Sequence, residues 1–88
     1  MNLPYEIQYT PTAEKAIRAL DRSIQHRILK KIEAIAEAPR GFGSIKLAGQ
    51  NAYRVRVGHY RIIYSILDDR VLIIIVDVGH RREIYRAL

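Results

Sequence analysis

Near the end of the chain, residues 71–78 are apolar at every position except Asp77. A strand with one exposed face alternates apolar and polar residues, whereas an unbroken apolar run is typical of a strand inside a sheet, covered on both faces. The run is also far shorter than the roughly 20 residues that a helix needs to cross a membrane. The sequence therefore predicts a β-sheet in which residues 71–78 form a central strand.

Two segments before this run alternate apolar and polar residues, as half-exposed strands do. They cover residues 53–57 and 60–67, and the two residues between them, Gly58 and His59, predict a tight turn. A second turn is predicted at Asp68-Asp69, directly before the apolar run. We expect the three strands to form an antiparallel meander.

The first half of the chain has helical periodicity after a short N-terminal strand at residues 3–9. Thr10 followed by Pro11 marks the start of one helix. A second helix, which ends before Pro39, carries a stripe of isoleucines at helical spacing: Ile24, Ile28, Ile32 and Ile35. Because the connection between the helices is short, we expect a helical hairpin packed on one face of the sheet. The predicted fold is α+β, in a single domain that covers residues 1–88.

The chain is strongly basic, with 15 lysine and arginine residues against 9 aspartate and glutamate residues and a formal net charge of +6. This balance favours an anionic partner such as nucleic acid, and the alternative is a basic surface that serves solubility alone. The absence of cysteine excludes disulfides and thiolate metal sites. No histidine pair has the spacing of a zinc helix and no phosphate-loop motif is present, so we expect no metal and no cofactor.

The predicted turn places Arg56 directly opposite Arg61 in the hairpin. The apolar residues of both strands then share one face, and the arginines share the other. Like charges opposite one another destabilise a sheet, so a sequence selected for stability alone would avoid this pair. The pair therefore indicates an anion site. The alternative is a solvated face on which the two arginines splay apart.

The residues after the apolar run continue the basic pattern. Arg81 and Tyr85 lie four apart, and an aromatic side chain beside arginines is the combination that stacks on a base and holds a phosphate in single-stranded RNA. Alternatively, Tyr85 packs the C-terminus against the sheet. We expect Asp77 to be a hydrogen-bonded structural carboxylate rather than an acid catalyst.

Three stretches together resemble the RelE family of the RelE/ParE superfamily of type II toxin–antitoxin toxins. They read YRVRVG at residues 53–58, YRIIY at residues 60–64, and VGHR at residues 78–81 followed by IY. The resemblance covers nearly the whole chain and implies the RelE-like fold. It also implies a ribosome-dependent endoribonuclease that cleaves mRNA in the ribosomal A site and so inhibits translation.

The resemblance implies a set of site residues. Arg61 and Arg81 would stabilise the transition state after attack by the RNA's own 2′-hydroxyl. Tyr85 would stack on a base, and Arg54 and Arg56 would position the backbone. Further basic residues expected to contact RNA are Lys46, Arg82 and Arg86.

One departure from the family concerns the proton acceptor. Well-known members carry lysines at the positions of Arg54 and Arg56, and an arginine does not lose its proton in proteins. A lysine base is therefore excluded here. Either arginine charge and alignment suffice, or another group, such as His80, accepts the proton.

The resemblance also implies partners. These are a RelB-like antitoxin that is acidic and partly disordered, the ribosome and its mRNA, with no membrane and with DNA bound only through the antitoxin complex. A cytoplasmic protein is expected. Two other functions stay open: a ParE-like inhibitor of DNA gyrase, and a module that binds RNA or the ribosome without cleaving it.

Overall fold

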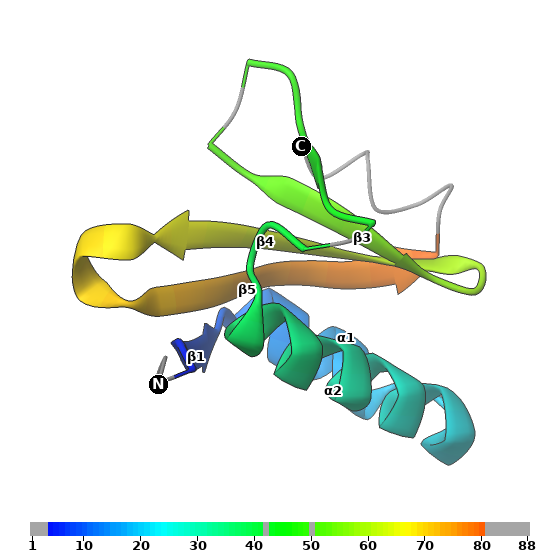
Figure 1. Ribbon diagram of the computed structural model, residues 1–88. Coiled ribbons are helices and arrows are strands. Elements are labelled where there is room, and N and C mark those ends of the chain that lie inside the picture. The colour runs from blue at the N-terminus through cyan, green and yellow to red at the C-terminus, as the bar shows by residue number, and fades with distance from the viewer. Residues whose placement is uncertain (1–3, 42, 50, 81–88) are drawn as a thin grey trace.

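The computed structural model describes residues 4–41, 43–49 and 51–80. It contains a five-stranded sheet and two helices (Figure 1). In chain order the elements are β1 (Glu6–Tyr9), α1 (Pro11–Arg18), α2 (Arg22–Glu37), β2 (Ile45–Lys46), β3 (Tyr53–Val57), β4 (Tyr60–Leu67), the 3₁₀ turn η1 (Asp68–Arg70) and β5 (Leu72–His80). The predicted α+β class is confirmed.

The strands lie in the order β1-β5-β4-β3-β2. Strands β3, β4 and β5 form the predicted antiparallel meander. Strand β1 pairs in parallel with β5, so β5 is an interior strand as its apolar run predicts. The described helices are too short or too polar to span a membrane.

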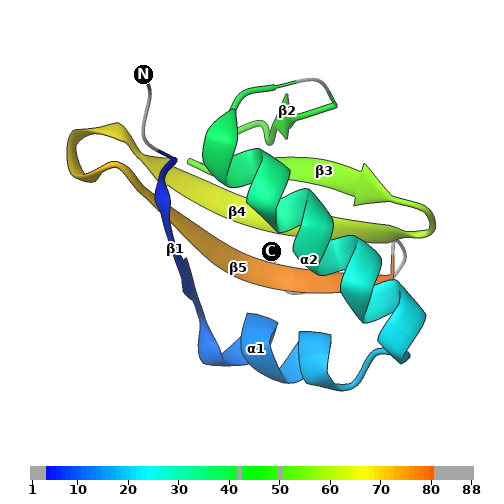
Figure 2. The same ribbon diagram turned by 60° about the horizontal axis from the view of Figure 1, so that its bottom comes forward.

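Both helices cover the same face of the sheet, as Figure 2 shows. The isoleucine stripe of α2 lies at the centre of the core, where Ile28, Ile32 and Ile35 are at most 4% exposed. They meet buried residues of the sheet, among them Ile62, Tyr64, Ile73 and Ile75. Each such side chain contributes roughly 1.5–3 kcal/mol through its burial. The α2–sheet contact therefore fixes which face of the sheet is left for solvent or a ligand.

Thr10 joins α1 to the sheet. Its hydroxyl accepts a hydrogen bond from the Ala13 amide (3.1 Å), which caps α1 as predicted. The same hydroxyl donates to the Val76 carbonyl (2.6 Å). Val76 lies at a bulge in β5, because Ile63 pairs with Asp77 while the next residue, Tyr64, pairs with Ile75.

The expectation that residue 71 begins the central strand is wrong. Val71 has a φ of 50° and follows the 3₁₀ turn, and its side chain is 45% exposed. Its carbonyl accepts a hydrogen bond from the Glu6 amide (2.9 Å), so the turn aligns the start of β1 with the start of β5. The N-terminal strand likewise begins at Glu6, later than the predicted start at residue 3.

Candidate nucleic-acid interface

The β3–β4 hairpin has the predicted register. Val57 pairs with Tyr60, Arg56 with Arg61, and Val55 with Ile62. Gly58 in the turn has a φ of +61°, a conformation that glycine adopts without strain. The two arginines therefore lie directly opposite one another, and their side chains leave the sheet on the same side.

Three arginines share the sheet face that the helices leave uncovered. Val55 and Ile62 point into the core under the helices, so their strand neighbours Arg54, Arg56 and Arg61 point the other way. We call these three residues the arginine face. Beside them lies a small second cluster of apolar side chains, in which Ala52 and Ile63 are buried and Leu47 and Val76 are partly buried.

The three arginines differ in exposure. Arg56 is exposed and Arg54 is half-buried, whereas Arg61 is 7% exposed and is the buried charged residue of the described chain. Arginine is almost never buried to this extent unless it is paired. The Arg61 side chain is thus buried next to the exposed side chain of Arg56, so the two arginines do not both extend into solvent.

Among the described residues of β5, the acidic residue on the side of the arginine face is Asp77. It pairs with Ile63 of β4, while Gly79, two residues later in β5, pairs with Arg61. The Asp77 carboxylate accepts a hydrogen bond from the Val78 amide (2.8 Å), as expected of a structural carboxylate. Ion pairs of the described chain join Arg18 to Glu14 and Arg40 to Asp68, so no described carboxylate neutralises Arg54 or Arg56.

Two predicted site residues lie away from the arginine face. Lys46 pairs with Tyr53, whose ring packs against the main core, so the Lys46 side chain leaves the sheet on the helix side. His80 pairs with Tyr60 on that same side, and their ring centroids are 5.9 Å apart. His80 also stacks on His59 at 6.3 Å. The structure therefore does not bring Lys46 or His80 together with the arginines. Four further predicted residues lie outside the described residues: Arg81, Arg82, Tyr85 and Arg86.

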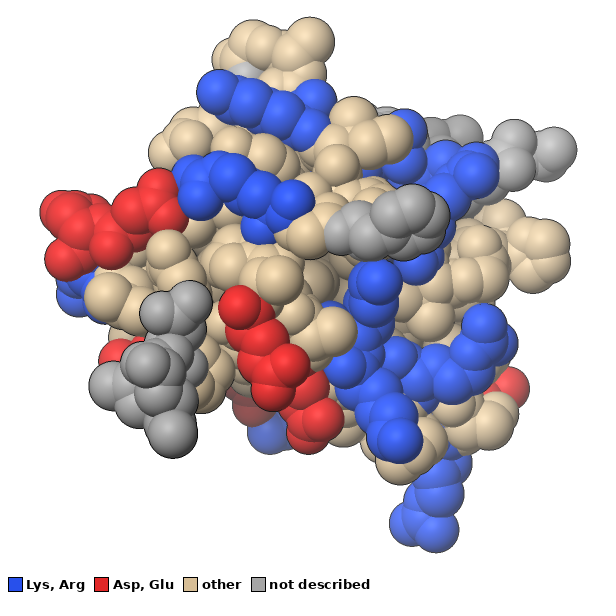
Figure 3. Space-filling model, in the orientation of Figure 1, with Lys and Arg blue, Asp and Glu red and all other residues tan. Residues whose placement is uncertain are grey.

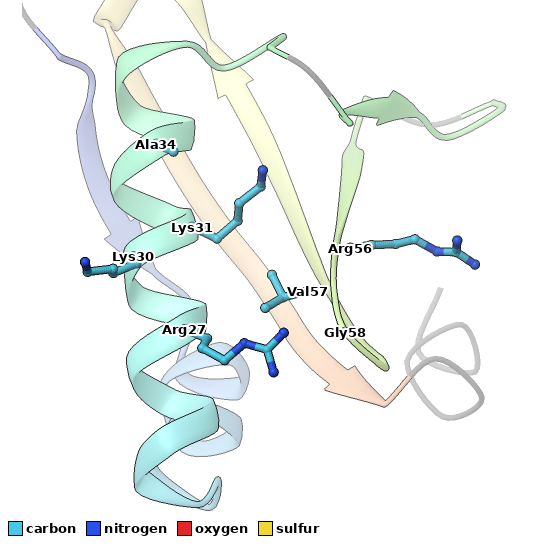
Figure 4. Close-up of a pocket in the computed structure, with 7 residues that line it drawn as sticks. All are labelled: Arg27, Lys30, Lys31, Ala34, Arg56, Val57 and Gly58. Carbon is cyan, nitrogen blue, oxygen red and sulfur yellow. The ribbon is translucent and has the colours of Figure 1, made fainter.

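A second basic surface was not predicted as a site. An open groove of about 460 Å³ runs between α2 and the edge of β3 (Figure 4), lined by Arg27, Lys30, Lys31, Ala34, Arg56, Val57 and Gly58. The sequence signal was the i, i+4 pair Arg27 and Lys31, which shares one side of α2. In the sequence it resembled an ordinary solvated helix face, because nothing there places β3 beside it.

Comparisons with known proteins identify the family of the chain. Residues 7–85 match the family described as the ParE toxin of the type II toxin-antitoxin system parDE. A putative RelE-like toxin protein of Escherichia coli is 30% identical over 82 residues, which cover 90% of this chain and 85% of that protein. The mRNA interferase toxin RelE of Escherichia coli K12 is 27% identical, with 94% of this chain and 92% of the relative covered.

A solved structure has the same fold. The toxin in the archaeal RelE–RelB complex from Pyrococcus horikoshii superposes with a TM-score of 0.79 at 28% identity, over 92% of this chain and 99% of that one. The family match spans most of the chain, and the curated relative at 30% identity extends over nine-tenths of it. The chain therefore belongs to the RelE family of the RelE/ParE superfamily of type II toxin–antitoxin toxins.

Proposed function

We propose that this protein is an endoribonuclease that cleaves mRNA in the ribosomal A site and so inhibits translation. The observation that carries the proposal is the directly opposed pair of Arg56 and Arg61 on the uncovered face of the sheet. Like charges in opposed positions destabilise a sheet by themselves. A bound phosphate between them turns this repulsion into two favourable contacts, because a guanidinium fork matches phosphate oxygens.

The proposed reaction uses the RNA's own 2′-hydroxyl. Its oxygen attacks the neighbouring phosphorus, the bond from phosphorus to the 5′-oxygen breaks, and the products are a cyclic 2′,3′-phosphate and a 5′-hydroxyl end. Arg61 and Arg81 stabilise the extra negative charge of the transition state, and Arg54 and Arg56 hold the backbone in line. Tyr85 stacks on a base.

Arginine stays protonated, so these residues act through charge and alignment and not as bases. His80 packs on Tyr60 at the helix side of the sheet. We therefore give it no part in the reaction. The 2′-hydroxyl proton passes to water, and water returns a proton to the departing 5′-oxygen.

The relatives support the class of activity and the partner. One relative is named an mRNA interferase, and the toxin from Pyrococcus horikoshii was solved in complex with RelB. By analogy, this chain is inhibited by a RelB-type antitoxin, and DNA is bound only through that complex. An acidic, partly disordered segment suits a domain of net charge +6, because it folds as it neutralises the basic surface. The site of action is the cytoplasm, where ribosomes are found.

A second function has one observation in its favour. The matching family is described by the ParE toxin of parDE, and ParE-like inhibition of DNA gyrase needs no RNA cleavage. The opposed arginines favour a phosphate-binding site, because one phosphate between them accepts hydrogen bonds from both guanidinium groups and offsets their mutual repulsion.

Cleavage of mRNA on ribosomes with an empty A site tests the proposal, with free RNA alongside. The wild-type protein is expected to cut ribosome-bound mRNA. Arg61→Gln should reduce the rate by roughly 100-fold or more, as loss of one transition-state contact does. Arg61→Lys keeps the positive charge of the buried residue, so its cleavage rate should fall less than that of Arg61→Gln. Arg18→Gln, on α1, is the matched control and should cut normally.

Blocked translation without cuts would reduce the protein to a ribosome-binding module. Inhibition of gyrase supercoiling without RNA cuts would establish the ParE-like function.

A further inference from the structure

The groove between α2 and β3 has the cations of α2 along one wall and the edge of β3 along the other. Figure 4 shows the side chains of Arg27 and Lys31 pointing from α2 toward β3, whereas Lys30 points away from it. Lys31 is half-buried and Lys30 is exposed, in agreement with these directions. The Arg27 guanidinium lies over the turn, 3.3 Å from the position that a Cβ atom would take at Gly58.

The groove has no neutralising partner in the described part of the chain. Its lining contains no carboxylate, and the ion pairs among the described residues involve other cations. Arg27 and Lys31 lie one helical turn apart, about 6 Å along the axis. This separation is close to that of neighbouring phosphates along an extended RNA strand.

Beyond its acidic N-cap, Asp21, helix α2 lacks the charges that stabilise helix ends. Acidic residues are favourable in the first turn and basic residues in the last. Helix α2 has neither: Arg22 begins it and Glu37 ends it. Figure 3 shows the result, with lysine and arginine side chains gathered over the N-terminal end of α2 and an acidic patch toward its other end. The basic residues of α2 therefore gather toward the end of the helix that borders the β3–β4 turn, where the Arg27 guanidinium lies close to Gly58.

We propose that the α2–β3 groove is a second phosphate-binding subsite, in which Arg27 and Lys31 hold the RNA backbone away from the point of cleavage. The inference rests on the proposed function, because that function makes RNA the ligand. Strand β3 connects the two surfaces: the edge of the strand forms one wall of the groove, while the Arg56 side chain extends to the arginine face on the other side (Figure 4). An RNA strand that passes over the β3–β4 hairpin contacts both.

An acidic protein segment is the other anionic ligand to consider. A second hollow of about 210 Å³ adjoins the groove at Lys31 and Ala34, and its walls are largely apolar, with Ala38, Val55 and Tyr64 among them. A peptide would use that apolar part. Lys31 borders both hollows, but Arg27 lies at the opposite end, over the turn of the hairpin that carries the arginine face. The position of Arg27 favours RNA.

The test compares two neighbouring lysines of one helix. Lys31→Gln and Lys30→Gln each remove one charge from α2, and Figure 4 places the first side chain toward β3 and the second away from it. Affinity is measured at several salt concentrations for a single-stranded RNA whose 2′-hydroxyls are methylated, which prevents cleavage. Each phosphate contact contributes about 0.7 to the slope of log K against log salt.

Lys31→Gln is expected to lower that slope by about 0.7 and to weaken binding about fivefold at 0.1 M salt, while Lys30→Gln changes both far less. Lys31→Arg should restore the wild-type values, which separates loss of charge from loss of folding. Arg27→Gln should resemble Lys31→Gln.

Equal effects of Lys31→Gln and Lys30→Gln would overturn the subsite, since they would reflect net charge alone. Polyglutamate serves as a probe for an acidic protein segment. If Lys31→Gln weakened the binding of polyglutamate but not of RNA, the groove would be a site for such a segment, and the RNA subsite would be overturned. Because the RNA probe cannot be cut, these results are independent of the cleavage assay. A protein that fails to cleave can still show the subsite, and an active enzyme can lack it.

Discussion

At the residue scale, Asp68 shows how one neighbour sets the charge of a side chain. Arg40 donates two hydrogen bonds to its carboxylate (3.0 and 2.8 Å), and the Tyr5 hydroxyl donates a third (2.8 Å). Arg40, the larger cause, and Tyr5 together lower the pKa of Asp68 from 3.8 to about 2. The pKa of this carboxyl is lower in the folded chain than in the unfolded chain. Such a carboxyl stabilises the fold at pH values above its unfolded pKa, and this stabilisation is lost as the pH falls through the folded pKa.

Asp68→Asn should therefore flatten the pH dependence of stability. Between pH 3.8 and about 2, the melting temperature of the wild-type protein should fall more steeply than that of the variant. Thermal unfolding at stepped pH values measures the difference. Asp69→Asn, at the neighbouring residue, is the matched control. If it reduced the pH dependence of the melting temperature as much as Asp68→Asn does, the assignment to Asp68 would be contradicted.

Val71 is a second informative residue, because its backbone is left-handed (φ 50°, ψ 49°) although its side chain is β-branched. This conformation costs an L-residue roughly 1–2 kcal/mol, and asparagine tolerates it best among the residues with a Cβ. Val71→Asn should raise the free energy of unfolding by about 1 kcal/mol in urea titrations. Val71→Ala keeps the Cβ and should gain much less. An asparagine variant that is less stable than the alanine variant would show that the turn is not strained.

At the element scale, Thr10 couples α1 to the bulge of β5 through one hydroxyl. Thr10→Ala removes the cap to Ala13 and the hydrogen bond to Val76, so the free energy of unfolding should fall by about 2 kcal/mol. Thr10→Ser keeps the hydroxyl and should retain most of that stability. Equal losses in both variants would assign the effect to the threonine methyl group instead.

The bulge also marks the point in the sheet beyond which the sequence does not predict which face a side chain lies on. Turn length and period-two alternation specify the β3–β4 register locally, so the opposed arginines followed from residues 53–64 alone. The bulge at Val76 has no comparable local signal. It shifts the rest of β5 by one residue, which brings Val78 into the core and moves His80 to the helix side. Without it, alternation would place His80 on the face of Arg61, where a base is useful.

The parallel pairing of β1 with β5 could not be predicted from the sequence either. It joins residues more than 60 positions apart, such as Ile7 and Ile73, and depends on how the helices return the chain to the sheet. The N-terminal strand could be predicted from its own residues, but its partner could not. The α2–β3 groove was missed for the same reason, since it combines a helix and a strand that are distant in sequence.

At the scale of the whole molecule, the net charge of +6 opposes folding through self-repulsion. Added salt screens that repulsion, so the melting temperature should rise between low and moderate ionic strength. A triple variant with Lys15, Arg22 and Lys30 changed to Gln has a net charge of +6 − 3 = +3 and should show a smaller rise. A melting temperature that falls with salt would mean that attractive ion pairs dominate instead.

We propose for the whole molecule that the opposed pair of Arg56 and Arg61 serves phosphate binding at the expense of stability. Arg56→Glu tests this most directly, with unfolding and cleavage of ribosome-bound mRNA measured on the same protein. An opposite charge facing Arg61 should raise the free energy of unfolding by about 0.2–1 kcal/mol. The cleavage rate should fall by about 100-fold, because the RNA backbone loses its alignment. A variant that gains stability and still cleaves at the wild-type rate would contradict the claim.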